Sequence, residues 1–199
     1  MCIRDRFTGV HVIHITAKAA RMIASARAMV CACPTTERNL GDGVVPMDLL
    51  LAENVGVSLG TDSQAQIDLL EDARELEYHL RLQRLERAVL DDQVSSLKSQ
   101  NLAALLFNCA TTNGARSIGA PGGTLEVGQP ADFFTVDLND PTVNGGSKDN
   151  LLASIVFSAS RAAVREVVVG GKPIVSEGQH LIQEEVVERF TDLQKRLWG

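Results

Sequence analysis

The stretch Ala28-Met-Val-Cys-Ala-Cys-Pro34 is a short apolar run that stops at a proline, a pattern typical of a buried β-strand. Before it, residues 10–16 form a β-branched run and residues 17–26 a helical pattern. After it, a short helix is expected over 47–54 and a third strand over 56–60. This alternation of strand and helix predicts an α/β fold, with a parallel sheet and helices packed outside it.

The second half of the chain has a different character. A long amphipathic region covers 67–92 and a second helical pattern covers 97–109, with a turn or two more over 113–118. From Gly119 onward, glycine and proline separate short strand patterns. We expect strands over 124–127, 132–138, 164–169 and 173–176, and helices over 151–157 and 183–197. A small antiparallel β region therefore follows the parallel part.

Composition excludes several classes of protein. The chain has 199 residues, 45% of them hydrophobic, which is enough for a real core. The excess of 25 acidic over 19 basic residues argues against a nucleic-acid partner. No apolar run reaches the ~20 residues of a membrane span, and no signal-peptide pattern follows Met1, so we expect a cytoplasmic protein without a membrane partner. The four cysteines make neither a disulfide framework nor a four-ligand zinc cluster, and we interpret them as small buried residues.

Polar residues gather where the three expected strands end. His11 and His14 belong to the first run, the polar segment 33–43 follows the second, and Gly60-Thr-Asp-Ser63 follows the third. Loops converge at the carboxyl ends of parallel strands, and ligands bind there. An aspartate at such a place can bind a metal or take a proton, and an imidazole can stabilise developing charge.

Each of these features also has a structural interpretation. Asp62 or Ser63 could cap the helix that follows. Because His11 and His14 are three residues apart, they point to opposite faces of a strand, so only one can face a site. Residues 35–46 could be a solvated loop. Composition and spacing alone assign no reaction.

Four segments resemble the amidohydrolase superfamily, in its deaminase branch. Val10-His-Val-Ile-His-Ile-Thr16 is similar to the sixth-strand motif of that branch, and Gly60-Thr-Asp-Ser63 to its eighth-strand aspartate motif. Gly123-Thr-Leu-Glu-Val-Gly-Gln-Pro-Ala-Asp-Phe133 resembles the start of its C-terminal β region. The segment Pro34-Thr-Thr-Glu-Arg-Asn-Leu-Gly-Asp-Gly43 is the most specific, because it resembles the formimidoylglutamate deiminases, as does the helix text over 70–82.

The resemblance implies a (β/α)8 TIM-type barrel with one catalytic zinc. Residues 7–118 would supply barrel strands 6–8, and residues 119–199 a small β-rich region with a closing helix. Residues 1–6 match nothing in the family. The implied reaction hydrolyses a small-molecule substrate, N-formimidoyl-L-glutamate, to N-formyl-L-glutamate and ammonia, and the complete enzyme could be a homodimer.

The resemblance also implies roles for particular residues. Asp62 would be a zinc ligand and the proton carrier, and His11 would hydrogen-bond the zinc-bound hydroxide and the tetrahedral centre. The expected substrate-binding residues are Thr36, Glu37, Arg38 and Ser63. His14 would be structural.

The family's other metal ligands have no match in this chain. A His-x-His pair is expected on the first barrel strand, and a His with a Glu on the fifth. Since catalytic zinc needs about three protein ligands, we expect the chain to be a fragment that neither holds zinc nor reacts alone. Two alternatives stay open: a deaminase of a guanine-like or adenosine-like substrate, and a non-catalytic protein that binds a partner.

Overall fold

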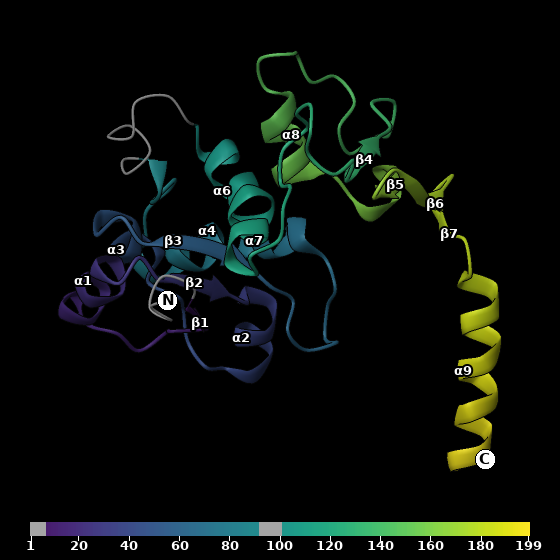
Figure 1. Cartoon of the computed structure of the whole chain (residues 1–199), viewed down its shortest axis with the longest axis horizontal. Helices are drawn as coiled ribbons and strands as arrows, with labels where there is room; N and C mark the ends of the chain where they lie inside the picture. The colour runs from purple at the N-terminus through teal and green to yellow at the C-terminus, as the bar shows by residue number, and fades with distance from the viewer. Residues whose placement is uncertain (1–6, 92–100) are drawn as a thin grey trace.

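The computed structural model describes residues 7–91 and 101–199, which are built around two sheets (Figure 1). The first sheet has three parallel strands in the order β1 (Thr8–Val10), β2 (Met29–Ala32) and β3 (Gly56–Leu59). The parallel pairing confirms the α/β prediction. These described strands form an open sheet with β1 and β3 at its edges, and they do not close a barrel.

The first strand lies earlier than expected. The prediction of a strand over 10–16 is wrong, because the chain leaves the extended conformation at His11 and Val12, where φ is 67° and 52°. The second and third strands match their predicted positions to within one residue at either end.

Helices follow each strand. They are α1 (Ala17–Ser25), α2 (Pro34–Leu40), α3 (Met47–Ala52), α4 (Leu69–Arg84), α6 (Leu102–Ala110) and α7 (Thr112–Ser117). The expected helices at α1, α3, α4, α6 and α7 are confirmed in the part of the chain that is described, whereas residues 92–100 of the predicted helical regions lie outside it.

Helix α2 corrects the prediction of a loop over 35–46. Pro34 occupies its first turn, where a missing N–H costs nothing, and Gly41 ends it in the left-handed conformation with φ 73°. Thr35, Thr36 and Glu37 are buried in spite of their polarity. They tolerate burial because each side chain has hydrogen-bond partners in the fold.

The main core lies between the sheet and its helices. Val30 and Ala32 of β2 and Val57 of β3 pack against leucines of the helices. The leucines without solvent exposure are Leu50, Leu80, Leu90 and Leu106. Since successive side chains of a strand point to opposite faces, the intervening residues of β2 and β3 lie on the face turned away from these helices.

The second sheet is antiparallel, as predicted. Its order is β4 (Phe133–Val136), β5 (Val164–Val169), β6 (Lys172–Ser176) and β7 (Gln179–His180), with α8 (Leu151–Ser158) and a 3-10 turn (Arg161–Ala163) before β5. The prediction of a strand over 124–127 is wrong. Gly122, Gly123 and Gly128 around it all have positive φ, which breaks the extended chain.

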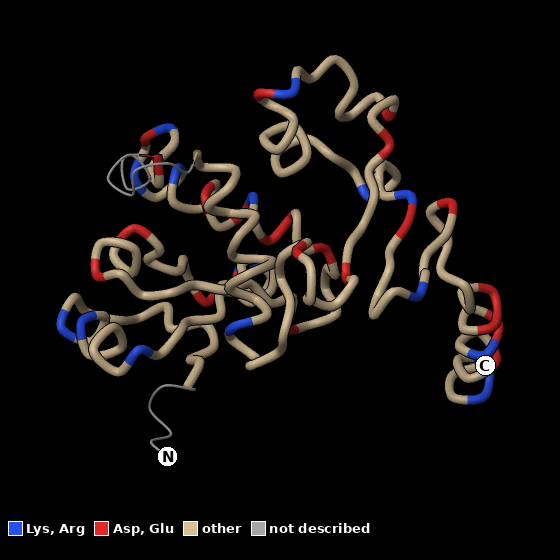
Figure 2. The backbone as a smooth tube through the Cα atoms, turned by 45° about the horizontal axis from the view of Figure 1, so that its top comes forward, with Lys and Arg blue, Asp and Glu red and all other residues tan. Residues whose placement is uncertain are grey.

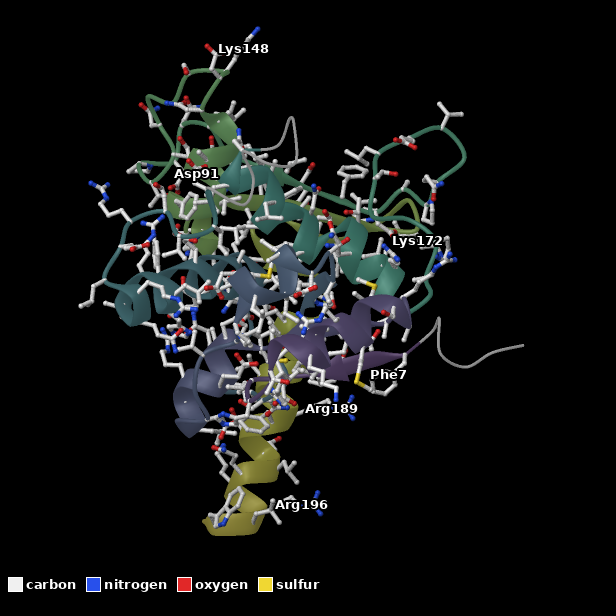
Figure 3. The ribbon with its side chains drawn as sticks, turned by 90° about the vertical axis from the view of Figure 1, so that its left-hand side faces the viewer. Phe7, Asp91, Lys148, Lys172, Arg189 and Arg196 are labelled. Atoms are coloured by element: carbon white, nitrogen blue, oxygen red, sulfur yellow. The ribbon has the colours of Figure 1, made fainter. Side chains whose placement is uncertain are left out.

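The last helix, α9 (Gln183–Trp198), extends away from the rest of the molecule (Figure 1). All of its residues are exposed, with acidic residues in its first turn and basic residues in its last (Figure 2). Arg189 and Arg196 point from it into solvent (Figure 3). None of the helices in the described part of the chain is both long and apolar enough to span a bilayer.

Candidate functional site

Two polar side chains meet where β1 and β3 end. His11 follows β1, and its backbone N–H still pairs with the Cys31 carbonyl at 2.8 Å. Asp62 lies three residues after β3, and its Oδ2 is 3.6 Å from Nε2 of His11. Both residues have positive φ, 67° for His11 and 55° for Asp62. Such strained backbone is uncommon outside glycine and concentrates at functional sites.

Glu37 of α2 holds the other side of the His11 ring. Its side chain is 1% exposed, and Oε1 accepts hydrogen bonds from His11 Nδ1 at 3.1 Å and from the Cys33 backbone N–H at 2.9 Å. Burial raises the pKa of Glu37, against the two hydrogen bonds that favour its carboxylate. With Nδ1–H bound to Glu37, the Nε2 atom of His11 is turned toward Asp62.

Thr36 and Ser63 join α2 to the segment after β3. The Thr36 hydroxyl donates to the Thr61 carbonyl at 2.7 Å and accepts from the Ser63 N–H at 3.1 Å, and the two hydroxyl oxygens are 3.0 Å apart. These contacts fix the loop that carries Asp62. That Thr36 and Ser63 contact a substrate stays a prediction.

Arg38 lies on the other side of α2. Its side chain is half-exposed and forms an ion pair of 2.7 Å with Glu75 of α4, whose second oxygen is 2.6 Å from His79 Nε2. Burial lowers the pKa of His79, and the neighbouring Glu75 carboxylate opposes this effect. The structure therefore does not bring Arg38 into contact with His11 or Asp62.

A buried carboxyl of α4 anchors the start of α2. Asp72 has no solvent exposure, and its Oδ1 accepts from the N–H and the hydroxyl of Thr35 at 3.0 and 2.8 Å. Burial raises the pKa of Asp72, and its Oδ2 has no hydrogen-bond partner. Asp72 could not be identified from the sequence, because nothing in the sequence of this helix distinguishes it from the other carboxylates beside it.

The structural alternatives at the two central residues are now decided. Asp62 does not cap a helix, because the N-cap of α4 is Asp68, whose Oδ1 accepts from Leu70 N–H and Glu71 N–H at 3.0 and 3.2 Å. His14 is exposed and outside a strand. Only His11 of the pair has a place in the site.

The cysteines differ from one another. Cys33 and Cys109 are buried, as predicted, and burial raises the pKa of Cys109 to about 12. Cys31 is only half-buried, and hydrogen bonding from the Cys33 thiol, helped by Ser58 and opposed by burial, lowers its pKa to about 7. The pKa of Cys33 rises because its thiol is held protonated by that contact and by burial. The interpretation as buried residues is wrong for Cys31, and Cys2 lies outside the described residues.

Cys31 is therefore expected to react with iodoacetamide with an apparent midpoint near pH 7, because only its thiolate is nucleophilic. Cys33 and Cys109 should remain mostly unmodified at that pH. Peptide mapping by mass spectrometry after short exposures at pH 5 to 9 measures the three rates in one sample. A Cys31 midpoint at or above the ordinary thiol value of about 8.5, or faster labelling of Cys33, would contradict this expectation.

Comparison with known proteins decides the family. A sequence profile of the amidohydrolase family matches residues 1–174. The chain belongs to the amidohydrolase family. It is 32% identical over 195 residues to a formimidoylglutamate deiminase from Pseudomonas aeruginosa, which covers 97% of this chain and 42% of that protein. It is also 32% identical over 193 residues to a 5-methylthioadenosine/S-adenosylhomocysteine deaminase from Pyrococcus abyssi, covering 96% and 43%.

Solved amidohydrolase structures share the fold. An amidohydrolase from Brucella melitensis superposes with a TM-score of 0.82 at 28% identity, over 98% of this chain and 42% of that one. An adenosine deaminase from Xanthomonas campestris with bound zinc gives 0.82 at 25% identity, over 96% and 42%. The chain thus spans less than half the length of the relatives it matches.

The family implies a catalytic zinc ion. Catalytic zinc takes about three protein ligands. Near Asp62 the described residues offer its carboxylate and Nε2 of His11, while Glu37 lies on the far side of the imidazole. Residues 7–91 and 101–199 therefore place too few metal ligands around Asp62 to form a complete catalytic zinc site.

Proposed function

We propose that this chain forms part of the active site of an enzyme that hydrolyses N-formimidoyl-L-glutamate to N-formyl-L-glutamate and ammonia. The observation that carries the proposal is the contact between Glu37 and His11, which orients the imidazole toward Asp62. Glu37 belongs to the segment 34–43, which resembles the formimidoylglutamate deiminases, and a protein of that name is 32% identical to the chain.

The residues suggest a division of labour. The carboxylate of Asp62 passes the two protons of the attacking water, one after the other, to the leaving nitrogen, so that ammonia departs as the formyl carbonyl forms. His11, held at Nδ1 by Glu37, directs Nε2 toward the tetrahedral centre, where a hydrogen-bonding group contributes a few kcal/mol. The buried Glu37 keeps the ring oriented, because its Oε1 is itself fixed by the Cys33 N–H.

Zinc is the proposed cofactor, with Asp62 as one ligand. The remaining ligands would have to come from outside the described residues. Thr36 and Ser63 are proposed to border the substrate, and Arg38 could reach a substrate carboxylate only by leaving Glu75.

A deaminase of an adenosine-like substrate is the second candidate. The relative from Pyrococcus abyssi, named as a 5-methylthioadenosine/S-adenosylhomocysteine deaminase, is as similar in identity as the first. The segment 34–43 favours the amidine substrate.

Two chimeric proteins separate these candidates. In one, the upstream part of the Pseudomonas aeruginosa deiminase precedes Phe7. In the other, the upstream part of the Pyrococcus abyssi deaminase takes that place. With zinc added, ammonia release is measured from N-formimidoyl-L-glutamate, adenosine and 5-methylthioadenosine. We expect activity from the first chimera, with at least about a 100-fold preference in kcat/KM for the amidine. Activity only in the second chimera, on an adenosine compound, would overturn the proposal.

A further inference from the structure

Cys31 and Cys33 lie next to each other where β2 ends, and both sulfurs face the same glycine, Gly60. Cys31 belongs to β2, and Cys33 follows the last residue of that strand with an extended φ of −128°, so the two side chains point to the same side. Gly60 lies beside them after β3. A Cβ atom on Gly60 would be 3.0 Å from Cys31 Sγ, closer than ordinary contact, and 3.5 Å from Cys33 Sγ, so both sulfurs pack against the bare backbone of Gly60.

Two further donor groups adjoin these thiols. One donor atom each from His11, Cys33 and Glu37 lies within 4.8 Å of the other two. In a tetrahedral zinc site with bonds of about 2.0–2.3 Å, neighbouring donor atoms are about 3.5 Å apart. Side-chain shifts of about 1 Å would therefore bring these three donors to one ion. The Cys31 thiol lies outside this group but is hydrogen-bonded to the Cys33 thiol, so a larger shift of its side chain would add a fourth donor.

A disulfide explains the two cysteines less well. Residues two apart on a strand are separated by about 6.6 Å along it, whereas a disulfide needs Cβ atoms about 3.5–4.5 Å apart. A metal ion needs no such approach, because it lies between the two sulfurs. Thiolate, imidazole and carboxylate together suit a borderline-soft ion rather than Mg²⁺ or Ca²⁺.

We infer that Cys31, Cys33, His11 and Glu37 form a binding site for one thiophilic divalent cation of the Zn²⁺ and Cd²⁺ class, separate from the Asp62 carboxylate. Binding displaces the thiol protons, which pass to the buffer, and replaces the hydrogen bond between His11 and Glu37. An ion at this site would bind the His11 imidazole, which the proposed reaction also uses. Excess thiophilic metal would then inhibit the enzyme.

Cadmium titration of the full 199-residue chain, with Cys2 changed to Ser, tests the site without any turnover. Thiolate coordination produces a ligand-to-metal charge-transfer band in the ultraviolet, which a site of oxygen and nitrogen donors lacks. We expect saturation at one ion per chain. Cys31→Ser and Cys33→Ser should each weaken the Kd at least about tenfold, because even loss of an outer-shell partner costs 10–100-fold.

Three matched variants sharpen the result. Cys109→Ala removes a buried thiol of α6 and should leave binding unchanged. Asp62→Asn should also leave it unchanged. Gly60→Ala removes no ligand, but its methyl group would press on the Cys31 sulfur and displace it, so this variant should weaken binding. Far-UV circular dichroism confirms folding. If Cys33→Ser does not fold, the cadmium affinities of Cys31→Ser and Gly60→Ala test the site instead.

Cadmium binding that survives both cysteine substitutions would overturn the inference, as would binding lost in Asp62→Asn. These outcomes are independent of the proposed reaction, since substrate is absent throughout.

Discussion

Changing Asp62 to Asn is expected to lower kcat/KM for the amidine substrate by about 1000-fold in the active chimera. Asn matches Asp in size and tolerates the positive φ of 55° found there, so the loop should keep its shape. Its amide cannot take a proton from water or return one to the leaving nitrogen. Initial rates of ammonia release over a range of substrate concentrations give the ratio.

Asp149→Asn is the matched control, because Asp149 is an exposed residue just before α8 and the chemical change is the same. It should alter kcat/KM less than about twofold, as surface substitutions away from a site usually do. If both variants lost activity equally, or if Asp62→Asn kept its rate, Asp62 would not be the proton carrier.

Glu77→Ala is expected to lower the free energy of unfolding by about 3–5 kcal/mol, the usual cost of removing one partner from a buried ion pair. Glu77 of α4 has no solvent exposure, and its carboxylate accepts from Arg81 Nε at 2.8 Å. It also accepts from the N–H groups of Val89 and Leu90 at 2.9 and 3.1 Å. With alanine at position 77, the three N–H donors lose this acceptor, and the segment after α4 that carries the buried Leu90 is held less firmly.

Urea denaturation measures the loss in the free energy of unfolding. The transition is followed by the chemical accessibility of the buried Cys109 thiol, a signal that does not depend on Trp198. Glu86→Ala is the control, since Glu86 is exposed on the same segment, and its effect should stay within about 0.5 kcal/mol. Similar losses for the two variants would show that the buried carboxylate does not hold the segment after α4.

The periodicity of the chain was sufficient to predict most of the fold. β2 and β3 are apolar runs with clear ends, and helices such as α1 and α4 repeat apolar residues every three or four positions. Helix α2 could not be predicted in this way. Its polar residues are buried through specific long-range partners, such as Asp72 for Thr35 and His11 for Glu37, and local composition carries no trace of such partners.

The site was predicted in part for the same reason. Strand ends indicated His11 and Asp62, and the structure brings them to 3.6 Å. Glu37 was expected to contact substrate, yet its carboxylate is committed to His11 and the Cys33 N–H. The special character of Cys31 depends on its neighbours across the sheet, Ser58 among them, and the spacing of the two cysteines alone does not reveal it.

Helix α9 affects the signals by which unfolding of this protein is measured. Every residue from Gln183 to Trp198 is exposed, so no core packing supports this helix. An isolated helix of such length is only marginally stable in water and melts gradually with temperature. Total helical ellipticity would therefore decline before the core unfolds, and the signal of the single tryptophan would follow the tail. A two-state fit to either probe would underestimate the cooperativity of the sheet and its helices.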